Sequence, residues 1–365
     1  MPAPGGGALL FTGFPGFIGA RLLPRLLELR PETRLSCLVQ ERFLHAAQAS
    51  IAEIEASHAH ARGRIDVIQG DITLPGLGLE AAAARTLRQE LTGAYHLAAV
   101  YDLAVAREVG QRINVEGTRN VLRFVAEAKH FERLEYVSTA YVSGRATGVF
   151  HETDLDVGQS FRNHYEETKY LAEVEVARSG IPSVVYRPGI VVGDSRTGET
   201  AKFDGPYFVL TAMERAPSPG LFLRIGSGRN TVNLVPVDFV IEALARLSAS
   251  PASMGKTYHL TDPEPLPTLE LAQLFARALG KRLALVPVPL ALAQALFAPR
   301  AVQRYFGMPV QALAYFDQRC HYDSRQAQAD LGRLGVRCPR LLDYLDRLVA
   351  FYRARRGSVR SWAMI

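Results

Sequence analysis

The stretch that decides the fold is Thr12-Gly13-Phe14-Pro15-Gly16-Phe17-Ile18-Gly19, which follows an apolar run and precedes a leucine-rich segment. We interpret it as a turn between a strand and a helix. Gly13 lets the chain leave the strand sharply, Gly16 lets the backbone approach a pyrophosphate, and Gly19 lets the helix pack closely on the strand. The amides that open the helix would then face an anion. The pattern TGxxGxxG in this context predicts a dinucleotide-binding site.

Length and composition indicate a compact globular protein and exclude several other classes. The 365 residues suit one large α/β unit with a smaller lobe, and 48% apolar with 21% charged residues exclude a disordered or collagen-like chain. The 42 Lys and Arg residues barely exceed the 36 Asp and Glu residues, giving a net charge of +6. Nucleic-acid binding is therefore not indicated, while an anionic cofactor, a thioester carrier or a solvated surface each explains the excess.

The cysteines and histidines give no sign of disulfides or of a metal. Cys37, Cys320 and Cys338 are odd in number and widely spaced, with no CxxC pair and no flanking histidine pattern. The nine histidines show no ligand spacing joined to carboxylates. We therefore expect a cytoplasmic protein without a metal site.

The most apolar later stretch runs from Leu283 to Ala298 and contains Pro287 and Pro289. It falls short of the roughly 18 uninterrupted apolar residues that a membrane-spanning helix needs, so no transmembrane segment is predicted. Core packing is the favoured interpretation of this stretch. A hydrophobic substrate wall or a helix that touches a membrane surface are the alternatives.

Apolar strand-like runs alternate with helical patterns through the first half of the chain. Strands are expected at 8–12, 35–39, 65–69, 94–98, 134–138 and 184–186, and helices at 16–29, 44–55, 85–91, 112–127 and 165–178. This alternation predicts βαβ crossovers that build a doubly wound parallel Rossmann sheet.

After Pro188 the alternation fails, and the pattern predicts a smaller C-terminal α/β substrate lobe. Residues 193–229 are rich in Gly, Pro and charge. Further elements are expected at 231–236 (strand), 238–248 (helix), 269–279 (helix) and 283–288 (strand), with two more helices ending near 353. The expected division is a dinucleotide-binding domain of residues 1–190 plus about 231–260, a substrate lobe of about 191–230 plus 261–353, and a flexible tail of 354–365.

A second motif is Tyr165-Glu166-Glu167-Thr168-Lys169, which lies inside a helical pattern. Tyr165 and Lys169 are one turn apart and share a helix face. A tyrosine hydroxyl with a pKa of about 10 needs a nearby cation for acid–base work at neutral pH, and Lys169 would supply it. Taken alone, the pair also fits an ordinary amphipathic helix surface.

Two hydroxyls, Ser138 and Thr139, follow the strand that ends near Val137. Ligands of parallel sheets bind beyond the carboxyl ends of the strands. A hydroxyl there can donate to a carbonyl oxygen that gains negative charge as hydride arrives. Capping of the strand end is the alternative role for both residues.

In this order the motifs resemble the extended short-chain dehydrogenase/reductase family over nearly the whole chain. Tyr165 and Lys169 resemble its catalytic pair, Thr139 falls where the family has Ser or Thr, and Ser138 is an auxiliary candidate. Further similar segments are Gly70-Asp71, His96-Leu97-Ala98-Ala99, Asn114-Val115-Glu116-Gly117-Thr118, Tyr186-Arg187-Pro188-Gly189 and Val235-Pro236-Val237-Asp238. The resemblance implies a cofactor site formed by Thr12, Gly13, Pro15, Gly16, Phe17, Ile18, Gly19, Gln40, Arg42, Asp71, Ile72, Leu97, Ala98, Ala99, Asn114, Tyr165, Lys169, Arg187, Pro188, Gly189 and Ile190.

Three segments look most like the fatty acyl and thioester reductase (male sterility) branch of that family. They are residues 137–142, 165–173 (YEETKYLAE) and 187–193. The resemblance implies NAD(P)H-dependent reduction of a carbonyl, either an acyl thioester or a derived aldehyde or ketone. Thr139 would hold the oxygen, Tyr165 would deliver the proton and Lys169 would tune it. The implied partners are a hydrophobic acyl thioester and, from family habit, a second copy in a homodimer.

The choice of cofactor depends on Val39-Gln40-Glu41-Arg42, at the end of the second strand. NAD enzymes carry an acidic residue here that bonds the ribose 2′-hydroxyl, and Gln40 occupies that position. Arg42 is suited to a 2′-phosphate, whereas Glu41 argues against one. The stretch favours NADP(H) over NAD(H).

Two other functions fit the same motifs. A nucleotide-sugar epimerase or dehydratase shares the scaffold and the catalytic residues, but residues 200–229 show no evident uridine diphosphate site and Leu221–Leu223 is apolar instead. A non-catalytic regulatory protein that binds a dinucleotide is the other alternative, against which the intact Tyr165 and Lys169 argue.

Overall fold

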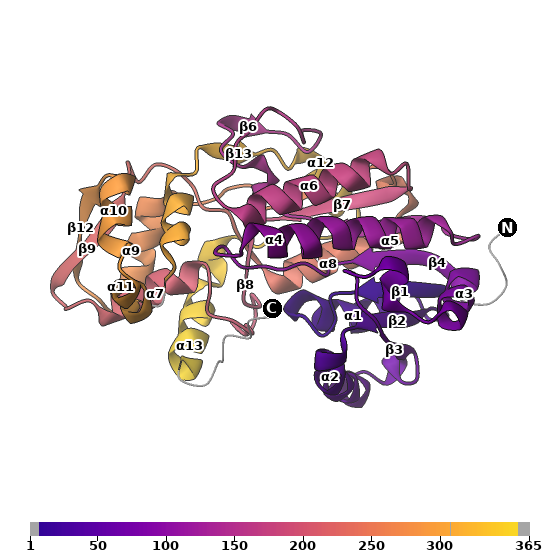
Figure 1. Cartoon of the computed structure of the whole chain (residues 1–365). Coiled ribbons are helices and arrows are strands. Elements are labelled where there is room, and N and C mark those ends of the chain that lie inside the picture. The colour runs from indigo at the N-terminus through magenta and orange to yellow at the C-terminus, as the bar shows by residue number, and fades with distance from the viewer. Residues whose placement is uncertain (1–6, 307, 357–365) are drawn as a thin grey trace.

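A seven-stranded parallel sheet forms the centre of the molecule (Figure 1). The computed structural model describes residues 7–306 and 308–356. The strand order is β11-β7-β5-β4-β1-β2-β3. These strands are β1 (Ala8–Thr12), β2 (Arg34–Val39), β3 (Ile65–Gln69), β4 (Leu91–His96), β5 (Arg133–Val137), β7 (Ser183–Pro188) and β11 (Thr257–Leu260).

Helices cover both faces of the sheet, which confirms the predicted doubly wound fold. Apolar side chains of α1 (Phe17–Leu29), α2 (Leu44–Ser57) and α8 (Val237–Ala249) form one buried cluster with β1 and β2. Those of α3 (Ala81–Glu90), α5 (Gly117–Ala126) and α6 (His164–Arg178) form a second cluster on the other face. All five residues of β1 are buried, as expected for a parallel strand covered on both faces.

The helix expected at 112–127 is interrupted. It begins as α4 (Arg107–Gly110), continues as a π-helical stretch (η4, Gln111–Glu116) and becomes α5 only at Gly117. The buried Asn114 lies in the π-helical stretch, and its side chain bonds both backbone groups of Val100 and the Thr168 hydroxyl. These contacts fix the chain after β4 against α6, and they offer a local reason for the irregular turn.

The segment 193–229, where the alternation of the sequence pattern fails, contains a helix and a strand. Helix α7 (Pro206–Arg215) opens with a proline, which suits a first helical position, and buries Tyr207, Leu210 and Met213. Strand β9 (Gly220–Ile225) pairs in parallel with β12 (Leu283–Val288). Because the partner of β9 is far away in sequence, local patterning gave no sign of the pair.

The lobe beyond the sheet has its own apolar core. Tyr207 and Leu210 of α7 pack with Leu271 and Phe275 of α9 (Thr268–Ala278) and with α13 (Leu345–Arg355). Helices α10 (Leu290–Phe297) and α11 (Arg300–Phe306) lie farther out. Helix α13 includes 354 and 355 of the expected tail, and 357–365 lie outside the described residues.

The chain returns from the lobe to the sheet before α13. Strand β13 (Cys320–Tyr322) pairs with β6 (Gly148–Phe150), and α12 (Arg325–Arg333) packs on α8 and β11. Ala327 and Leu331 of α12 belong to the core beside the sheet. We therefore propose a division that places about 320–338 with the sheet, where sequence patterning had placed them in the lobe. Among the described helices, none combines the length and apolar character needed to cross a membrane.

Candidate active site

A cavity of about 380 Å³ lies at the carboxyl ends of the strands, between the sheet and the lobe. Most of the predicted site residues line it: Thr12, Gly13, Gly16, Phe17, Ile18, Gly19, Gln40, Arg42, Ile72, Leu97, Ala98, Ala99, Ser138, Thr139, Tyr165, Lys169, Pro188, Gly189 and Ile190. Four predicted cofactor residues do not line it, namely Pro15, Asp71, Asn114 and Arg187.

The glycine turn leaves no space for side chains at two positions. Gly13 has a φ of +92°, and a Cβ there would lie 2.8 Å from the carbonyl carbon of Leu97. A Cβ at Gly19 would lie 2.7 Å from the carbonyl oxygen of Gly13. Helix α1 has no side-chain cap at Gly16 and no acidic residue in its first turn. The uncapped amides of α1 therefore fit the phosphate groups of a dinucleotide.

A buried hydrogen-bonded chain joins the ends of β1 and β4. The Thr12 hydroxyl lies 2.7 Å from His96 Nδ1, and His96 Nε2 lies 3.0 Å from the Thr118 hydroxyl. The Ala98 amide donates to the Thr12 oxygen at 3.2 Å. Burial lowers the pKa of His96 to about 3, so its imidazole is neutral. These contacts hold the segment after β4 against the cavity.

Gln40 and Arg42 line the cavity where β2 ends. Arg42 Nε donates to Gln40 Oε1 at 3.0 Å, and the guanidinium lies 4.7 Å from the centre of the Phe43 ring. Asp71 lies behind this pair and accepts a hydrogen bond from the Thr73 amide at 2.8 Å. Burial opposes ionisation of Asp71, but bonds from Thr73 and Gln40 outweigh it and lower the pKa of the carboxyl. Asp71 thus supports Gln40 from outside the cavity.

Tyr165 and Thr139 meet at the other end of the cavity. Tyr165 lies in the first turn of α6. Asn163 caps this helix, because its side-chain oxygen accepts a hydrogen bond from the Glu166 amide at 3.0 Å. Burial raises the pKa of the Tyr165 phenol, and a hydrogen bond with the Thr139 side chain acts in the opposite direction. The structure therefore brings together the two hydroxyls that the sequence assigned to proton transfer and oxygen binding.

Lys169 is buried and bound to the end of β5. Its ammonium donates to the Val137 carbonyl at 2.8 Å and to the Tyr136 hydroxyl at 3.1 Å. Within the described part of the chain no hydrogen bond joins Lys169 to Tyr165, so the predicted effect of Lys169 on the phenol would act through its charge. Burial lowers the pKa of Lys169 to about 8, while the charge of Glu173 acts to raise it.

Ser138 and Arg187 share a buried partner that sequence reasoning did not single out. The Ser138 hydroxyl donates to the carboxylate of Glu173, which also pairs with Arg187 at 2.6 Å. Both charged side chains are almost fully buried. Arg187 therefore points away from the cavity, although Pro188 and Gly189 line it. Glu173 follows Lys169 by four residues on the same helix face, which was the available signal.

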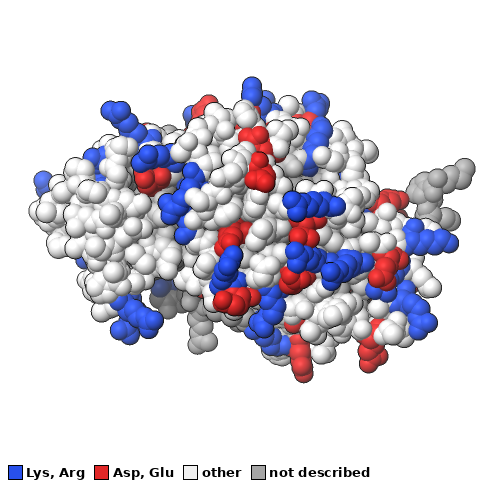
Figure 2. All heavy atoms as spheres, turned by 45° about the horizontal axis from the view of Figure 1, so that its top comes forward, with Lys and Arg blue, Asp and Glu red and all other residues white. Residues whose placement is uncertain are grey.

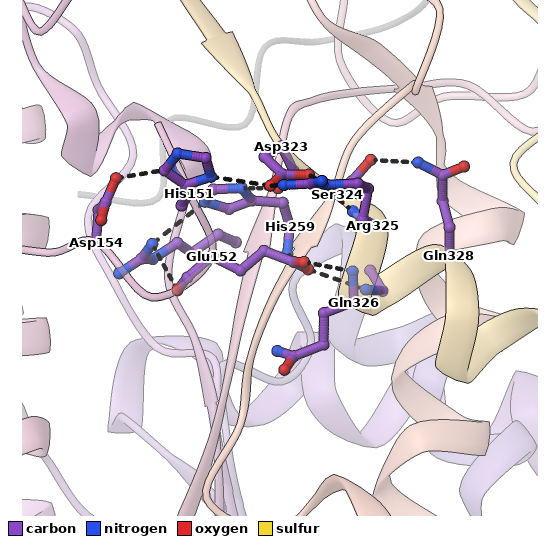
Figure 3. Close-up of polar contacts among 11 residues, drawn as sticks. His151, Glu152, Asp154, His259, Asp323, Ser324, Arg325, Gln326 and Gln328 are labelled. Carbon is purple, nitrogen blue, oxygen red and sulfur yellow. Dashed lines mark hydrogen bonds and ion pairs between the residues drawn. The ribbon is translucent and has the colours of Figure 1, made fainter. Parts of the chain in front are cut away.

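The ion pair continues into a polar network behind the site (Figure 3). Arg187 Nη1 lies 3.2 Å from His259 Nε2, and His259 Nδ1 donates to the Asp323 carbonyl at 2.8 Å. Burial and the charge of Arg187 lower the pKa of His259 to about 3. The Glu152 carboxylate accepts backbone N–H groups of His259, Gln326 and Ala327. This network ties α12 to the edge of the sheet.

The lobe supplies an apolar wall opposite the glycine turn. The lining side chains from this half include Val209, Leu271, Phe275, Ala312 and Phe316. Tyr101 lines the cavity as well, and its ring meets that of Tyr165 edge-on with centres 5.1 Å apart. The end of the cavity that holds Thr139 and Tyr165, which we call the reacting corner, therefore opens towards a largely hydrophobic space.

Comparison with known proteins agrees with this geometry. The model of the family described as male sterility protein, an NAD-binding family, matches residues 11–244. One chain of the linear gramicidin synthase of Brevibacillus parabrevis is 29% identical over 70% of the present chain, which spans 5% of that protein. Fatty acyl-CoA reductase wat of Drosophila melanogaster is 26% identical over 65% of this chain and 53% of its own length.

A similar solved structure is the terminal R domain from the myxalamid PKS-NRPS biosynthetic pathway. It is 27% identical with a TM-score of 0.79, covering 99% of this chain and 93% of that one. A dTDP-glucose 4,6-dehydratase from Streptomyces venezuelae shares the fold, at 21% identity and a TM-score of 0.64 over 96% of this chain and 98% of that one. The chain spans about half or less of the curated relatives cited above. The chain belongs to the male sterility protein family, a reductase family of the extended short-chain dehydrogenases/reductases.

Proposed function

We propose that this chain reduces the carbonyl of a hydrophobic acyl thioester, or of the derived aldehyde, with NADPH as the reductant. The observation that carries the proposal is the single cavity, which joins the glycine turn, the Thr139–Tyr165 pair and the apolar wall of the lobe. A thioester with a long acyl chain needs all three features. The names of the relatives, a fatty acyl-CoA reductase and a terminal R domain, support the same substrate class.

Each residue of the reacting corner then has a distinct task. A bound nicotinamide would supply the hydride. Thr139 would donate its hydroxyl hydrogen to the carbonyl oxygen and stabilise the negative charge that develops there. Tyr165 would deliver its phenolic proton to that oxygen, because its high pKa keeps it protonated at neutral pH. Lys169 of α6, whose ammonium is hydrogen-bonded to the end of β5, would keep a positive charge near Tyr165 and Thr139.

Ser138 has no direct task in this mechanism. Its hydroxyl hydrogen is already donated to Glu173, and breaking that bond would leave a buried carboxylate oxygen without its donor. We infer that Ser138 positions the strand end from behind, and that Thr139 is the hydroxyl that meets substrate.

The preference for NADPH rests on the end of β2. Arg42 lines the cavity there, and Gln40 replaces the acidic residue that would repel a 2′-phosphate. Dissociation constants for NADPH and NADH, measured by quenching of protein fluorescence, test this directly. We expect NADPH to bind at least about tenfold more tightly than NADH, because a charge-assisted hydrogen bond to the 2′-phosphate contributes that much binding free energy.

The substrate class is tested with a panel of acyl-CoA thioesters, long-chain aldehydes and nucleotide sugars. We expect NADPH oxidation at 340 nm with the thioesters and aldehydes and no reaction of the sugars. Conversion of a nucleotide sugar with bound NAD would favour the epimerase or dehydratase alternative. Absence of turnover with every carbonyl would favour a non-catalytic binding protein. The three cysteines are free, which supports work in a reducing compartment such as the cytoplasm.

A further inference from the structure

The outer end of the lobe is a separate layer beyond the cavity. We call this layer the lobe tip and define it as β9, β12, α10 and α11. The strands β9 and β12 pair with each other, α10 packs on β9, and α11 packs on α10 and on α7. In Figure 1 the lobe tip forms the end of the molecule opposite β1 to β3. Its outer surface therefore has no neighbour among the described elements.

The two-stranded sheet of the lobe tip exposes apolar side chains. Leu221 pairs with Ala284 and Leu223 pairs with Val286, so these four side chains share one face of the sheet. Leu221 is 69% exposed, and Ala284 and Val286 are also exposed. A face of this composition is normally buried in a soluble protein.

Helices α10 and α11 extend the same character. Leu292 and Leu296 are one turn apart on α10, and both are exposed, as are Ala291 and Ala295. No charged residue occurs in α10. Tyr305 of α11 is exposed too. The core packing that the sequence favoured for 283–298 therefore holds only for the inner face, where Ala293 is buried.

The inner face of α10 packs on the cavity wall. Ala293 lies in one apolar cluster with Met308 and Ala312, and both of these residues line the cavity. Helix α10 and the segment that carries Met308 and Ala312 thus separate the candidate substrate space from the exposed apolar surface.

The net positive charge of the chain is concentrated in and beside the lobe tip. Residues 271–316 contain five of the 42 Lys and Arg residues and none of the 36 Asp and Glu residues, so they hold nearly all of the net charge of +6. Among the described residues, none of the five takes part in an ion pair; they are Arg277, Lys281, Arg282, Arg300 and Arg304. Figure 2 shows that end of the molecule as mainly white with blue groups around it.

We propose that the lobe tip docks on a membrane surface that carries anionic lipids. Apolar side chains surrounded by Arg and Lys are the combination that binds the boundary between headgroups and acyl chains. The exposed Tyr305 suits the same boundary. The outer face of α10 offers aliphatic carbon without hydrogen-bonding groups other than Gln294, which suits fluid lipid better than a specific protein surface.

Charge also argues against a second copy of the chain as the occupant. The four elements of the lobe tip contain Arg224, Arg300 and Arg304 and no acidic residue, so two lobe tips brought face to face would place six basic residues together without an acidic partner in those elements. The docking goes beyond the proposed function and is independent of it, since binding to lipid requires no turnover. It would place the cavity wall next to a lipid phase that holds acyl chains.

The test is co-sedimentation of the full chain with large vesicles. One set contains phosphatidylcholine alone, and the other contains phosphatidylcholine with phosphatidylglycerol. We expect binding to the anionic set at least about tenfold tighter, because each basic side chain near such a surface contributes a factor of about five in affinity. The variant R300E/R304E should lose binding by more than about tenfold at low salt.

The apolar contribution is tested with L292S/L296S. Its matched control is L74S/L342S, which changes two other exposed leucines outside the lobe tip; the exposed fractions are 49% and 50% for the test pair and 48% and 51% for the control pair. We expect the test variant to bind vesicles about tenfold more weakly and the control to bind like the wild type. Equal melting temperatures for all variants would show that each is folded.

Three outcomes would overturn the proposal. Vesicle binding that is absent, or that both leucine variants weaken equally, would remove lipid as the occupant. Self-association in light scattering that L292S/L296S abolishes would assign the lobe tip to a second copy. Binding of a purified acidic acyl carrier protein, lost in the same variant while vesicles do not bind, would assign it to a protein partner. None of these outcomes depends on whether the carbonyl reduction occurs.

Discussion

The sheet half and the lobe half of the cavity are built by different forces. On the sheet side, buried polar contacts fix the residues, as the bonds of His96 and the Glu173–Arg187 pair show. On the lobe side, the wall consists of apolar side chains such as Leu271 and Phe275. Polar contacts specify direction, whereas apolar packing specifies mainly shape and volume. Changes on the sheet side should therefore affect the chemical step, and changes in the lobe should affect the choice of substrate.

The largest effect is expected at Tyr165. The variant Tyr165→Phe keeps the ring and its packing but removes the proton donor, so kcat should fall by about 10³-fold. NADPH affinity should change by less than about twofold, because cofactor binding relies mainly on the glycine turn. The matched control is Tyr170→Phe on the same helix, which should keep its activity. Turnover of Tyr165→Phe equal to that of the control would remove Tyr165 from the mechanism.

The next largest effect should distinguish the roles of the adjacent hydroxyls of Thr139 and Ser138. Thr139→Val should lower kcat by about 10²-fold, since it removes the donor to the carbonyl oxygen. Ser138→Ala should instead lower the free energy of unfolding by about 1–3 kcal/mol, because the Glu173 carboxylate loses a buried donor. Steady-state kinetics and urea unfolding on both variants measure this contrast. A larger loss of kcat in Ser138→Ala than in Thr139→Val would reverse the assignment.

The buried ion pair should have a large effect on stability. Glu173→Gln leaves the Arg187 guanidinium without its anion, which should cost about 3–5 kcal/mol in the free energy of unfolding. Glu175 lies on the same helix and pairs with Arg119 nearer the surface, so Glu175→Gln should cost less than about 1 kcal/mol. Urea unfolding followed by circular dichroism compares the two. Equal losses would show that the Glu173 pair does not organise the sheet half.

The pH dependence should report Lys169. Burial lowers its pKa from 10.5 to about 8, so the folded protein loses this proton near pH 8 whereas the unfolded chain keeps it to higher pH. Turnover should fall as the pH rises through 8, while the contribution of Lys169 to the free energy of unfolding should rise in the same range. In Lys169→Arg the charge does not titrate, and the fall in kcat should disappear. An unchanged profile in that variant would attribute it to another group.

The smallest effect is expected in the lobe wall. Ala312 lines the cavity, whereas Ala314 in the same short helix (η7, Val310–Asp317) is buried away from it. Ala312→Leu should lower kcat/KM for long-chain thioesters by about four- to tenfold, because each displaced methylene is worth about 0.8 kcal/mol. Short-chain thioesters should be affected less. The control Ala314→Leu should alter both substrates alike, and the same loss with long and short chains in Ala312→Leu would contradict the assigned wall.

Much of the sheet half could be predicted from the sequence. The strand ends and the glycine turn have strong local patterns, and they place Gly13 and Thr139 together at the carboxyl ends of the strands. Arg187 shows the limit of such reasoning. Its backbone passes the cavity as expected, but neighbouring side chains on a strand point in opposite directions, and its partner Glu173 comes from another element.

The lobe was harder to predict because its contacts are distant in sequence. The pairing of β9 with β12 joins segments about sixty residues apart, and short strands carry little pattern of their own. Apolar periodicity also does not reveal which face of a helix will be covered. For that reason Leu292 was expected in the core, and the structure leaves it exposed.

The return of the chain from the lobe to the sheet limits how this protein can be re-engineered. Because Glu152 holds the first amides of α12, and Ala327 fills the core beside the sheet, the lobe is not an appendage that one cut would release. A chimera that exchanges lobes to transfer substrate range would have to take about 320–338 from the same parent as the sheet. A truncation after residue 319 would remove part of the coenzyme half along with the lobe's last helix.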